Sequence, residues 1–393
     1  MVEFLVDLKL SIDQKKVLDK LLEWYFFKKE EKYITLGGYA GTGKTTLISV
    51  LRNNLHQKDK KLKVAFASYT GKAVRVLKNK LVESNSIYKQ DLIGTIHSLI
   101  YSPIINSKKE ITGWKRKEEL EAKLIIIDEA SMIDEKIWDD LLDYHIPIIA
   151  IGDHGQLPPI NGSFNLMEDP ILKLEQIHRQ AENNPIIKLS TWAREKGQIP
   201  SGVYGPGIKK ILKRDLDSAE EIEELLRSRD GDTLILCGYN STRVKLNEFI
   251  RNSREFNPFI PEVGDRVICL KNNHSAEIYN GMLGTINSLE SKNDDWFKAE
   301  IKMDDDLVLY DGLIAVKQFN NKESLNFTKN RRGFLEGDLF DYGYALTVHK
   351  AQGSQARRVI LFEERFPKID EKMWRKWLYT AITRAVEELI IIG

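Results

Sequence analysis

The sequence is poor in cysteine: its 393 residues contain only Cys237 and Cys269, each inside an apolar run. Two such cysteines suggest neither a disulfide framework nor a zinc site, so we predict two buried thiols. Long apolar runs are also missing, because none approaches the roughly 20 residues that a membrane span needs. The segment 1–10 carries Glu3 and Asp7 and lacks the basic start and apolar core of a signal peptide. These absences predict a cytoplasmic protein, in the host cytoplasm if it is viral, with no membrane partner.

An excess of charge of either sign is absent as well, since 59 Lys and Arg residues face 58 Asp and Glu residues and leave a net charge of +1. Any binding of nucleic acid must therefore come from local basic patches. The candidate patches are Lys58–Lys63, Lys108–Lys117, Lys209–Arg214 and Lys329–Arg332. Taken singly, each patch is more typical of a solvated surface. The length is enough for about two to three domains, each with its own core.

The sequence does contain a glycine-rich stretch, Gly38–Thr45, with the G-x-x-x-x-G-K-T spacing of a phosphate-binding loop. Its glycines let successive backbone N–H groups turn towards phosphate oxygens, and the helix expected after them adds the positive end of its dipole. Lys44 can then reach the outer phosphates, and the Thr45 hydroxyl can ligate Mg²⁺. A β-type run at Tyr33–Leu36 and a helical run at Thr46–Leu51 flank this phosphate loop. The stretch predicts ATP and Mg²⁺ as cofactors.

Gln14 lies just upstream of the phosphate loop, after the helix-capping residue expected at Ser11. Its side-chain amide can pair with the adenine edge through one donor and one acceptor, so we predict that it recognises adenine. The predicted nucleotide-binding residues of this part of the chain are Gln14, Gly38, Ala40, Gly41, Thr42, Gly43, Lys44, Thr45 and Thr46.

Two acidic residues follow the apolar run Leu124–Ile127, which is typical of a strand buried on both faces of a parallel sheet. Such sheets bind ligands at the carboxyl ends of their strands, where Asp128 and Glu129 stand. We predict that Asp128 holds Mg²⁺ through water and that Glu129 polarises the attacking water. Gln156 follows a further buried strand and is predicted to sense the γ-phosphate.

Three stretches, Gly38–Thr45, Asp128–Ser131 and Gly152–Pro159, resemble the first motifs of superfamily 1 helicases. The closest match is superfamily 1B, the branch of the RecD-type and phage Dda-type DNA helicases. Later motifs follow in the family order, at Leu174–Arg179, Gly343–Ser354 and Tyr379–Ala385. The resemblance implies that Arg179 faces the γ-phosphate, that Arg384 is a second arginine finger from the opposite lobe, and that Gly353 lies toward the ATP cleft. The catalytic residues predicted in this way are Lys44, Asp128, Glu129, Gln156, Arg179 and Arg384, of which Gln156, Arg179 and Arg384 also join Gly353 in the nucleotide-binding set.

Candidate contacts with nucleic acid lie where strands end. The hydroxyl of Thr70 and the ammonium of Lys72 suit a phosphodiester backbone, since neither needs to read a base, although an ordinary strand-to-helix turn looks the same. Thr95 and His97 follow in the next such turn. The resemblance adds Thr347 and His349. Trp114 stands in a basic hairpin insertion, and we hypothesise that this hairpin splits the duplex; a simple surface hairpin is nearly as plausible.

The expected fold is α/β, with two RecA-like P-loop NTPase lobes, a small hairpin insertion and an SH3-like β-barrel insertion. Short strand-like pieces separated by turns such as Asn280-Gly281 predict the barrel. The predicted boundaries are 1–97 and 120–180 for lobe 1A, 98–119 for the hairpin 1B, 181–255 and 339–393 for lobe 2A, and 256–338 for the barrel 2B.

The resemblance implies an ATP-dependent DNA helicase that moves 5′ to 3′ along single-stranded DNA and unwinds duplexes, using Mg²⁺ and ATP. Its implied partners are single-stranded DNA, junctions of single- and double-stranded DNA, and replication or recombination proteins, and it is expected to work as a monomer. An RNA helicase of superfamily 1 and a DNA-stimulated ATPase that moves or clamps without strand separation remain open. A small-molecule kinase would leave the second lobe unexplained.

Overall fold

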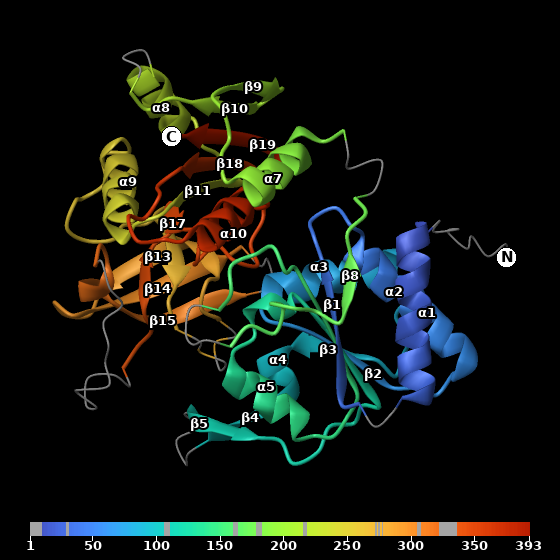
Figure 1. Ribbon diagram of the computed structural model, residues 1–393. Coiled ribbons are helices and arrows are strands. Elements are labelled where there is room, and N and C mark those ends of the chain that lie inside the picture. The colour runs from blue at the N-terminus through green and yellow to red at the C-terminus, as the bar shows by residue number, and fades with distance from the viewer. Residues whose placement is uncertain are drawn as a thin grey trace, which may run out of the picture. The chain divides into compact units, whose positions relative to one another are not determined.

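A computed structural model describes residues 10–393 except 29–30, 106–110, 160–163, 178–182, 215–217, 272, 274–275, 277, 305–307 and 322–335. The chain divides into two compact units, Met1–Arg194 and Glu195–Gly393, which Figure 1 colours from blue to green and from green to red. Among the described residues, no helix is both long and apolar enough to cross a membrane.

The first unit is built on a six-stranded sheet in which every strand pairs in parallel with its neighbours. The strand order is β3-β2-β6-β7-β1-β8. The strands are β1 (Tyr33–Gly38), β2 (Val64–Ser68), β3 (Leu92–Thr95), β6 (Leu124–Asp128), β7 (Ile148–Gly152) and β8 (Leu172–Leu174). The carboxyl ends of β6, β7 and β1 therefore lie side by side at one edge of the sheet.

Side chains alternate between the two faces of this sheet, as the pleat of a strand requires. Leu124 and Ile126 pack on one face with residues of α1 (Ile12–Phe27), α2 (Lys44–Lys58) and α3 (Gly71–Glu83). Ile125 and Ile127 pack on the other face with α4 (Ile96–Ile100) and α5 (Glu135–Leu142). Because both faces are covered, the strands are continuously apolar and their carboxyl ends are left to carry polar residues.

Two short elements complete the first unit. A 3₁₀ turn, η1 (Ala130–Met132), follows β6, and an antiparallel hairpin of β4 (Tyr101–Ile105) and β5 (Ile111–Arg116) follows α4. The hairpin falls inside the insertion predicted at 98–119. The helix α7 (Pro185–Lys196) then crosses the boundary between the units.

The second unit contains a six-stranded sheet in the order β17-β11-β18-β19-β10-β9. All pairings are parallel except the β9-β10 hairpin. The strands are β9 (Gly202–Gly205), β10 (Ile208–Ile211), β11 (Thr233–Cys237), β17 (Ala345–Thr347), β18 (Ala356–Phe362) and β19 (Ala385–Ile392), and the helices are α8 (Ser218–Arg227), α9 (Asn240–Asn252) and α10 (Glu371–Ile382).

A five-stranded antiparallel sheet, in the order β15-β14-β13-β12-β16, lies between α9 and β17 in the sequence. Its strands are β12 (Arg266–Cys269), β13 (Leu283–Ser291), β14 (Trp296–Met303), β15 (Leu309–Ala315) and β16 (Phe340–Tyr342), with the 3₁₀ turn η2 (Val316–Gln318) after β15. An isolated bridge joins Ile314 of one edge strand to Asp338, just before the other edge strand. The sheet therefore curls until its two edges meet at one point.

The antiparallel sheet shares a hydrophobic core with α9 and the parallel sheet, since Ile235, Leu246 and Val267 belong to the same buried cluster. Two buried ion pairs also fasten α9 to this region, Arg243–Asp341 at 2.7 Å and Arg251–Asp265 at 2.9 Å. The insertion is thus packed into the second unit through α9.

The structure differs from the sequence expectations in two local places. The Gly- and Pro-rich composition of segment 201–207 predicts a loop. The segment instead forms β9 and the turn into β10, with Gly207 at a φ of 69°. One of the strand-like pieces that predict the barrel spans 307–310, whereas the strand observed there begins at Leu309 and runs on to Ala315. Both cysteines are buried free thiols, as predicted, and burial raises the pKa of each.

Candidate functional site

The phosphate loop connects the carboxyl end of β1 to the first residue of α2, Lys44. Gly41 and Gly43 adopt left-handed backbone conformations with φ of 80° and 74°, which glycine adopts without strain. A Cβ at Gly38 would lie 2.7 Å from Thr42 Oγ1 and 3.1 Å from Lys44 Cγ. The loop therefore needs glycine at these positions for its turn and for its close packing.

Lys44 is folded back onto its own loop. Its ammonium donates to the backbone oxygens of Gly38 at 2.7 Å and Tyr39 at 3.1 Å. Thr42, which is fully buried, donates its hydroxyl to the Tyr39 oxygen at 2.8 Å. Thr45 and Thr46 are half-buried in the first turn of α2. A bound phosphate would compete with two carbonyl oxygens for the Lys44 ammonium.

Gln14 contacts the phosphate loop from the first turn of α1. It takes part in a capping box with Ser11 at the start of α1, and its side-chain nitrogen donates to the backbone oxygen of Thr42 at 3.1 Å. Gln14 is only 1% exposed. The structure thus places the predicted adenine-recognising residue in contact with the loop.

Asp128 ends β6, and Glu129 follows it in a left-handed conformation with a φ of 57°. Burial and then the neighbouring charge of Glu129 raise the pKa of Asp128 to about 6, against the opposing influence of Lys44. The backbone N–H of Glu129 donates to the Asp128 carboxylate at 3.0 Å. Non-glycine residues in the left-handed region carry strain, which often marks a functional site. Glu129 has this conformation directly after Asp128, at the carboxyl end of β6.

Several buried polar atoms next to these acids have no hydrogen-bond partner among the described residues: Glu129 Oε2, Ser131 Oγ and Gln156 Oε1. Gln156 follows β7, and its side-chain nitrogen donates to Asp153 at 3.3 Å. Because buried polar groups in native proteins are nearly always paired, these atoms are available to hydrogen-bond a ligand or water. Ser131 was not singled out from the sequence, although it closes the quoted motif at 128–131.

No group of three or more His, Cys, Asp or Glu side chains suited to a metal occurs in the described part of the chain. A Mg²⁺ ion bound with a nucleotide does not need one, because phosphate oxygens and water supply most of its ligands. The Thr45 hydroxyl and the Asp128 carboxylate are oxygen donors of the kind that Mg²⁺ prefers. These residues therefore fit a nucleotide-bound Mg²⁺ ion.

In the second unit, Arg384 is buried directly after α10. Its guanidinium donates to the backbone oxygens of Thr380 at 3.0 Å and Ser354 at 3.2 Å. Gly353, beside Ser354, has a φ of 74°. The structure thus brings the two predicted nucleotide-binding positions of this unit together, while Arg179 lies outside the described residues.

The three threonines predicted to contact nucleic acid all stand at carboxyl ends of strands with their hydroxyls turned to backbone N–H groups. Thr70 caps α3 by accepting from Ala73 at 3.2 Å, and Thr95 caps α4 by accepting from Ser98 at 3.1 Å. Thr347 accepts from Lys350 at 3.4 Å. Each threonine therefore orients the first turn of the segment that follows its strand.

The remaining predicted contacts are less uniform. His97 and His349 are half-buried, and burial lowers the pKa of both, so they are neutral at pH 7. Trp114 is half-buried on β5, opposite Pro103 of β4. The side chain of Lys72 lies outside the described part of the structure.

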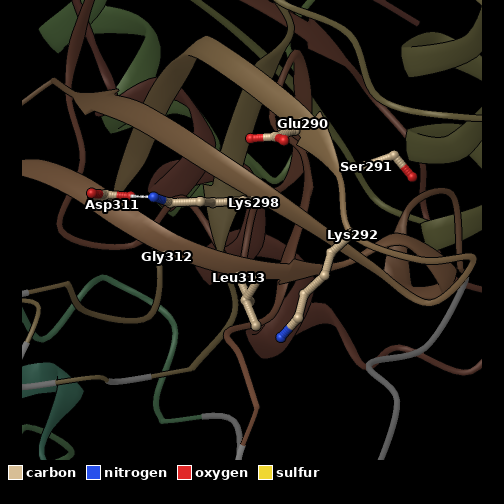
Figure 2. A pocket seen from close by; sticks show the side chains of 7 residues that line it. All are labelled: Glu290, Ser291, Lys292, Lys298, Asp311, Gly312 and Leu313. Atoms are coloured by element: carbon tan, nitrogen blue, oxygen red, sulfur yellow. Dashed lines mark ion pairs between the residues drawn. The ribbon is translucent and has the colours of Figure 1, made fainter.

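A pocket of about 500 Å³ lies on β13, β14 and β15 of the antiparallel sheet. In Figure 2 the side chain of Lys298 points to that of Asp311 on the neighbouring strand, and their charged groups are 3.6 Å apart. The pocket contains none of the predicted site residues, and Lys298 already pairs with Asp311. We assign it no ligand.

Two family profiles match the chain. Residues 9–204 match the profile described as AAA domain, and residues 342–392 match the UvrD-like helicase C-terminal domain. The first range includes the phosphate loop and both acidic residues, and the second includes Thr347 and Arg384.

Three of the curated relatives are named as DNA helicases. The chain is 27% identical to the ATP-dependent RecD2 DNA helicase of Deinococcus radiodurans, over 98% of this chain and 49% of that protein. It is 23% identical to the ATP-dependent DNA helicase Pif1 of Campylobacter jejuni, over 91% of this chain and 89% of that protein. It is 25% identical to the ATP-dependent DNA helicase dda of Enterobacteria phage T4, over 57% of this chain and 53% of that protein. The chain thus spans about half the length of the Deinococcus relative.

Solved structures of Pif1 helicases have a similar fold. One is from work on DNA unwinding at forked dsDNA, with a TM-score of 0.54 and 18% identity over 98% of this chain and 92% of that chain. Another is Pif1 from Bacteroides in complex with ADP-AlF3 and ssDNA, with a TM-score of 0.52 and 19% identity over the same shares. The predicted α/β fold with parallel sheets is confirmed, and the SH3-like form of the insertion stays a prediction.

Proposed function

Because this chain belongs to the helicases of superfamily 1B, we propose that it is an ATP-dependent DNA helicase that moves 5′ to 3′ along single-stranded DNA. One observation carries the proposal. The adjacent strands β6, β7 and β1 bring the acidic pair, Gln156 and the phosphate loop to one edge of a parallel sheet. Buried polar atoms without partners at this edge support the binding of a nucleotide there.

In this proposal the phosphate loop binds the ATP phosphates with its N–H groups. The Lys44 ammonium exchanges its hydrogen bonds to the Gly38 and Tyr39 oxygens for bonds to the outer phosphates. Thr45 and Asp128 would hold Mg²⁺, which neutralises the charge that develops on the phosphates. Glu129 orients and deprotonates the attacking water. Gln156 senses the γ-phosphate, and Gln14 contributes to the recognition of adenine.

Arg179 and Arg384 act as arginine fingers, the second one from the other unit. Such fingers contribute about 10³–10⁵ in rate where they have been measured. The contacts of Arg384 with the backbone of Ser354 join it to the motif that carries Thr347. Hydrolysis would thereby be tied to the grip on DNA.

The DNA grip uses the strand ends at Thr70, Thr95 and Thr347, with Lys72, His97 and His349 beside them. Contacts with phosphates alone give binding that is independent of sequence and weakened by salt. Opening a base-pair step costs about 1.4 kcal/mol on average, which one ATP per step readily supplies. The β4-β5 hairpin, with Trp114, would separate the strands.

The finer features extend the same proposal. The antiparallel sheet of the second unit is proposed to be the SH3-like barrel 2B of this branch. Junctions of single- and double-stranded DNA are the proposed substrates, with replication or recombination proteins as partners. The protein is proposed to work as a monomer in the cytoplasm.

The test is ATP-driven unwinding of duplexes that carry a single-stranded tail at the 5′ or the 3′ end. We expect unwinding of the 5′-tailed duplex alone. Glu129→Gln serves as the inactive control, with kcat lower by about 10²–10⁴ since it removes a general base. Unwinding only from a 3′ tail would refute the polarity, preference for RNA would favour an RNA helicase, and DNA-stimulated ATPase without unwinding would indicate a translocase.

A further inference from the structure

The base of the β4-β5 hairpin is bonded to residues outside the hairpin. Tyr101, the first residue of β4, stands opposite Arg116, the last residue of β5. A two-stranded ribbon is only marginally stable in water without further support. Any force on such a hairpin would therefore have to be borne at its base.

Tyr101 and Arg116 are both bonded to residues at the end of α5. The Tyr101 hydroxyl donates to the Asp140 carboxylate, and Arg116 pairs with Asp143, the residue that follows α5. Arg116 also lies 4.0 Å from Asp140. Burial and then the bond to Asp140 raise the pKa of Tyr101, which keeps its hydroxyl protonated as a donor.

Tyr144 contacts the chain on both sides of the hairpin, at Ile100 before β4 and at Lys117 after β5. Its hydroxyl oxygen is 2.9 Å from the Ile100 oxygen and 2.8 Å from the Lys117 oxygen, so its single hydrogen can bond either one. The Arg116 guanidinium lies over the Tyr144 ring, 5.5 Å from its centre. Asp140, Asp143 and Tyr144 together form what we call the hairpin clamp.

The basic residues at the end of β5 and just after it make bonds within the first unit. Arg116 is engaged by the clamp, and the Lys117 ammonium donates to the Ser98 oxygen at 2.7 Å. Lys115 pairs with Glu118 at 2.8 Å. These three cations of the patch predicted at 108–117 therefore contact the protein itself.

The helix that carries the clamp leads back to the catalytic acids. Asp134 caps the start of α5, six positions after Asp128, and only η1 lies between. Ile137, Trp138 and Leu141 bury α5 against the face of the sheet that includes Ile125 and Ile127 of β6. A packed helix thus connects the base of the hairpin to the strand that ends in Asp128.

We propose that Asp140, Asp143 and Tyr144 are positioning residues that hold the hairpin rigid against the duplex, so that each ATP hydrolysed yields strand separation. This inference rests on the proposed function. It assigns the coupling between movement and unwinding to residues at the end of α5, outside the predicted nucleotide-binding set.

The test uses the full chain and three measurements: ATPase with single-stranded DNA, movement along single-stranded DNA, and base pairs opened per ATP on a 5′-tailed duplex. Arg116→Asp places a third carboxylate beside Asp140 and Asp143. We expect it to lower base pairs per ATP about threefold to fivefold, the upper range for a solvent-exposed ion pair, and to leave ATPase and movement within about twofold. Tyr144→Phe should give a smaller loss of the same kind.

Rescue separates positioning from general damage to the fold. The double variant Arg116→Asp with Asp143→Arg restores an ion pair of reversed polarity and should recover most of the lost coupling. Lys317→Asp, which breaks an exposed ion pair with Asp295 in the other unit, is the matched charge-reversal control and should change nothing.

Unchanged coupling in both Arg116→Asp and Tyr144→Phe would overturn the inference. So would an equal loss of ATPase and unwinding, since that indicates damage to the fold. A parent protein that hydrolyses ATP with DNA but opens no duplex would instead refute the proposed function, before any variant is compared.

Discussion

At the scale of single residues, the phosphate loop depends on positions where no side chain fits. A Cβ at Gly38 would meet Thr42, Lys44 and Leu174 side-chain atoms at 2.7 to 3.2 Å. At Gly231 a Cβ would meet nothing within 4 Å. The two glycines thus differ in the space available for a methyl group, and this difference can be tested.

Gly38→Ala should destabilise the protein by about 1–3 kcal/mol, as overpacking does, and should weaken nucleotide binding because it displaces Thr42 and Lys44. Gly231→Ala is the matched control and should leave both unchanged. Thermal unfolding with and without a non-hydrolysable ATP analogue measures both effects. Equal behaviour of the two variants would show that the loop tolerates a side chain at Gly38.

At the scale of elements, α1 is tied to the nucleotide site through its first turn. The capping box of Ser11 and Gln14 starts the helix, and Gln14 also donates to the Thr42 oxygen. α10 is capped in a comparable way by Asp370, which accepts from Met373 at 2.7 Å in the other unit. The Ser11 cap is linked to the phosphate loop through Gln14, whereas the Asp370 cap lies in the other unit.

Ser11→Ala and Asp370→Ala should each cost about 1 kcal/mol of stability through the loss of a cap. Only Ser11→Ala should also raise the KM for ATP, by about threefold to tenfold, because a frayed α1 no longer holds Gln14 against the loop. Unfolding curves and ATPase titrations measure the two effects. A similar KM in both variants would mean that Gln14 holds the loop without help from its helix cap.

At the scale of the whole molecule, the functional residues are divided between two compact units. The phosphate loop, the acidic pair and Gln156 belong to the first, and Gly353 and Arg384 to the second. If Arg384 completes the catalytic site, the first unit binds nucleotide by itself but hydrolyses it only with the second unit.

Arg384→Lys tests this division. Lysine keeps the charge but loses the planar fork, so we expect the DNA-stimulated kcat to fall about 10³-fold while nucleotide affinity stays within about threefold. Binding of a fluorescent ADP analogue and steady-state ATPase provide the two readouts. A loss of affinity as large as the loss of kcat would assign Arg384 to ground-state binding.

The sequence by itself determined the parts of this protein that depend on short spacing along the chain. The phosphate loop, the acids after the apolar run at 124–127 and the helix cap at Ser11 follow from local patterns, because turn chemistry, caps and apolar periodicity act over a few residues. The order of the motifs was enough to indicate the helicase family.

Only the tertiary structure decided which distant residues meet. The contact of Gln14 with Thr42, the pairing of Arg243 with Asp341, 98 positions later, and the hold of Arg384 on Ser354 have no local signal. The same is true of the hairpin clamp, because Asp140, Asp143 and Tyr144 reach the hairpin only when α5 packs on the sheet. Such contacts depend on how buried faces fit together, and that fit is set by the packing of the whole unit.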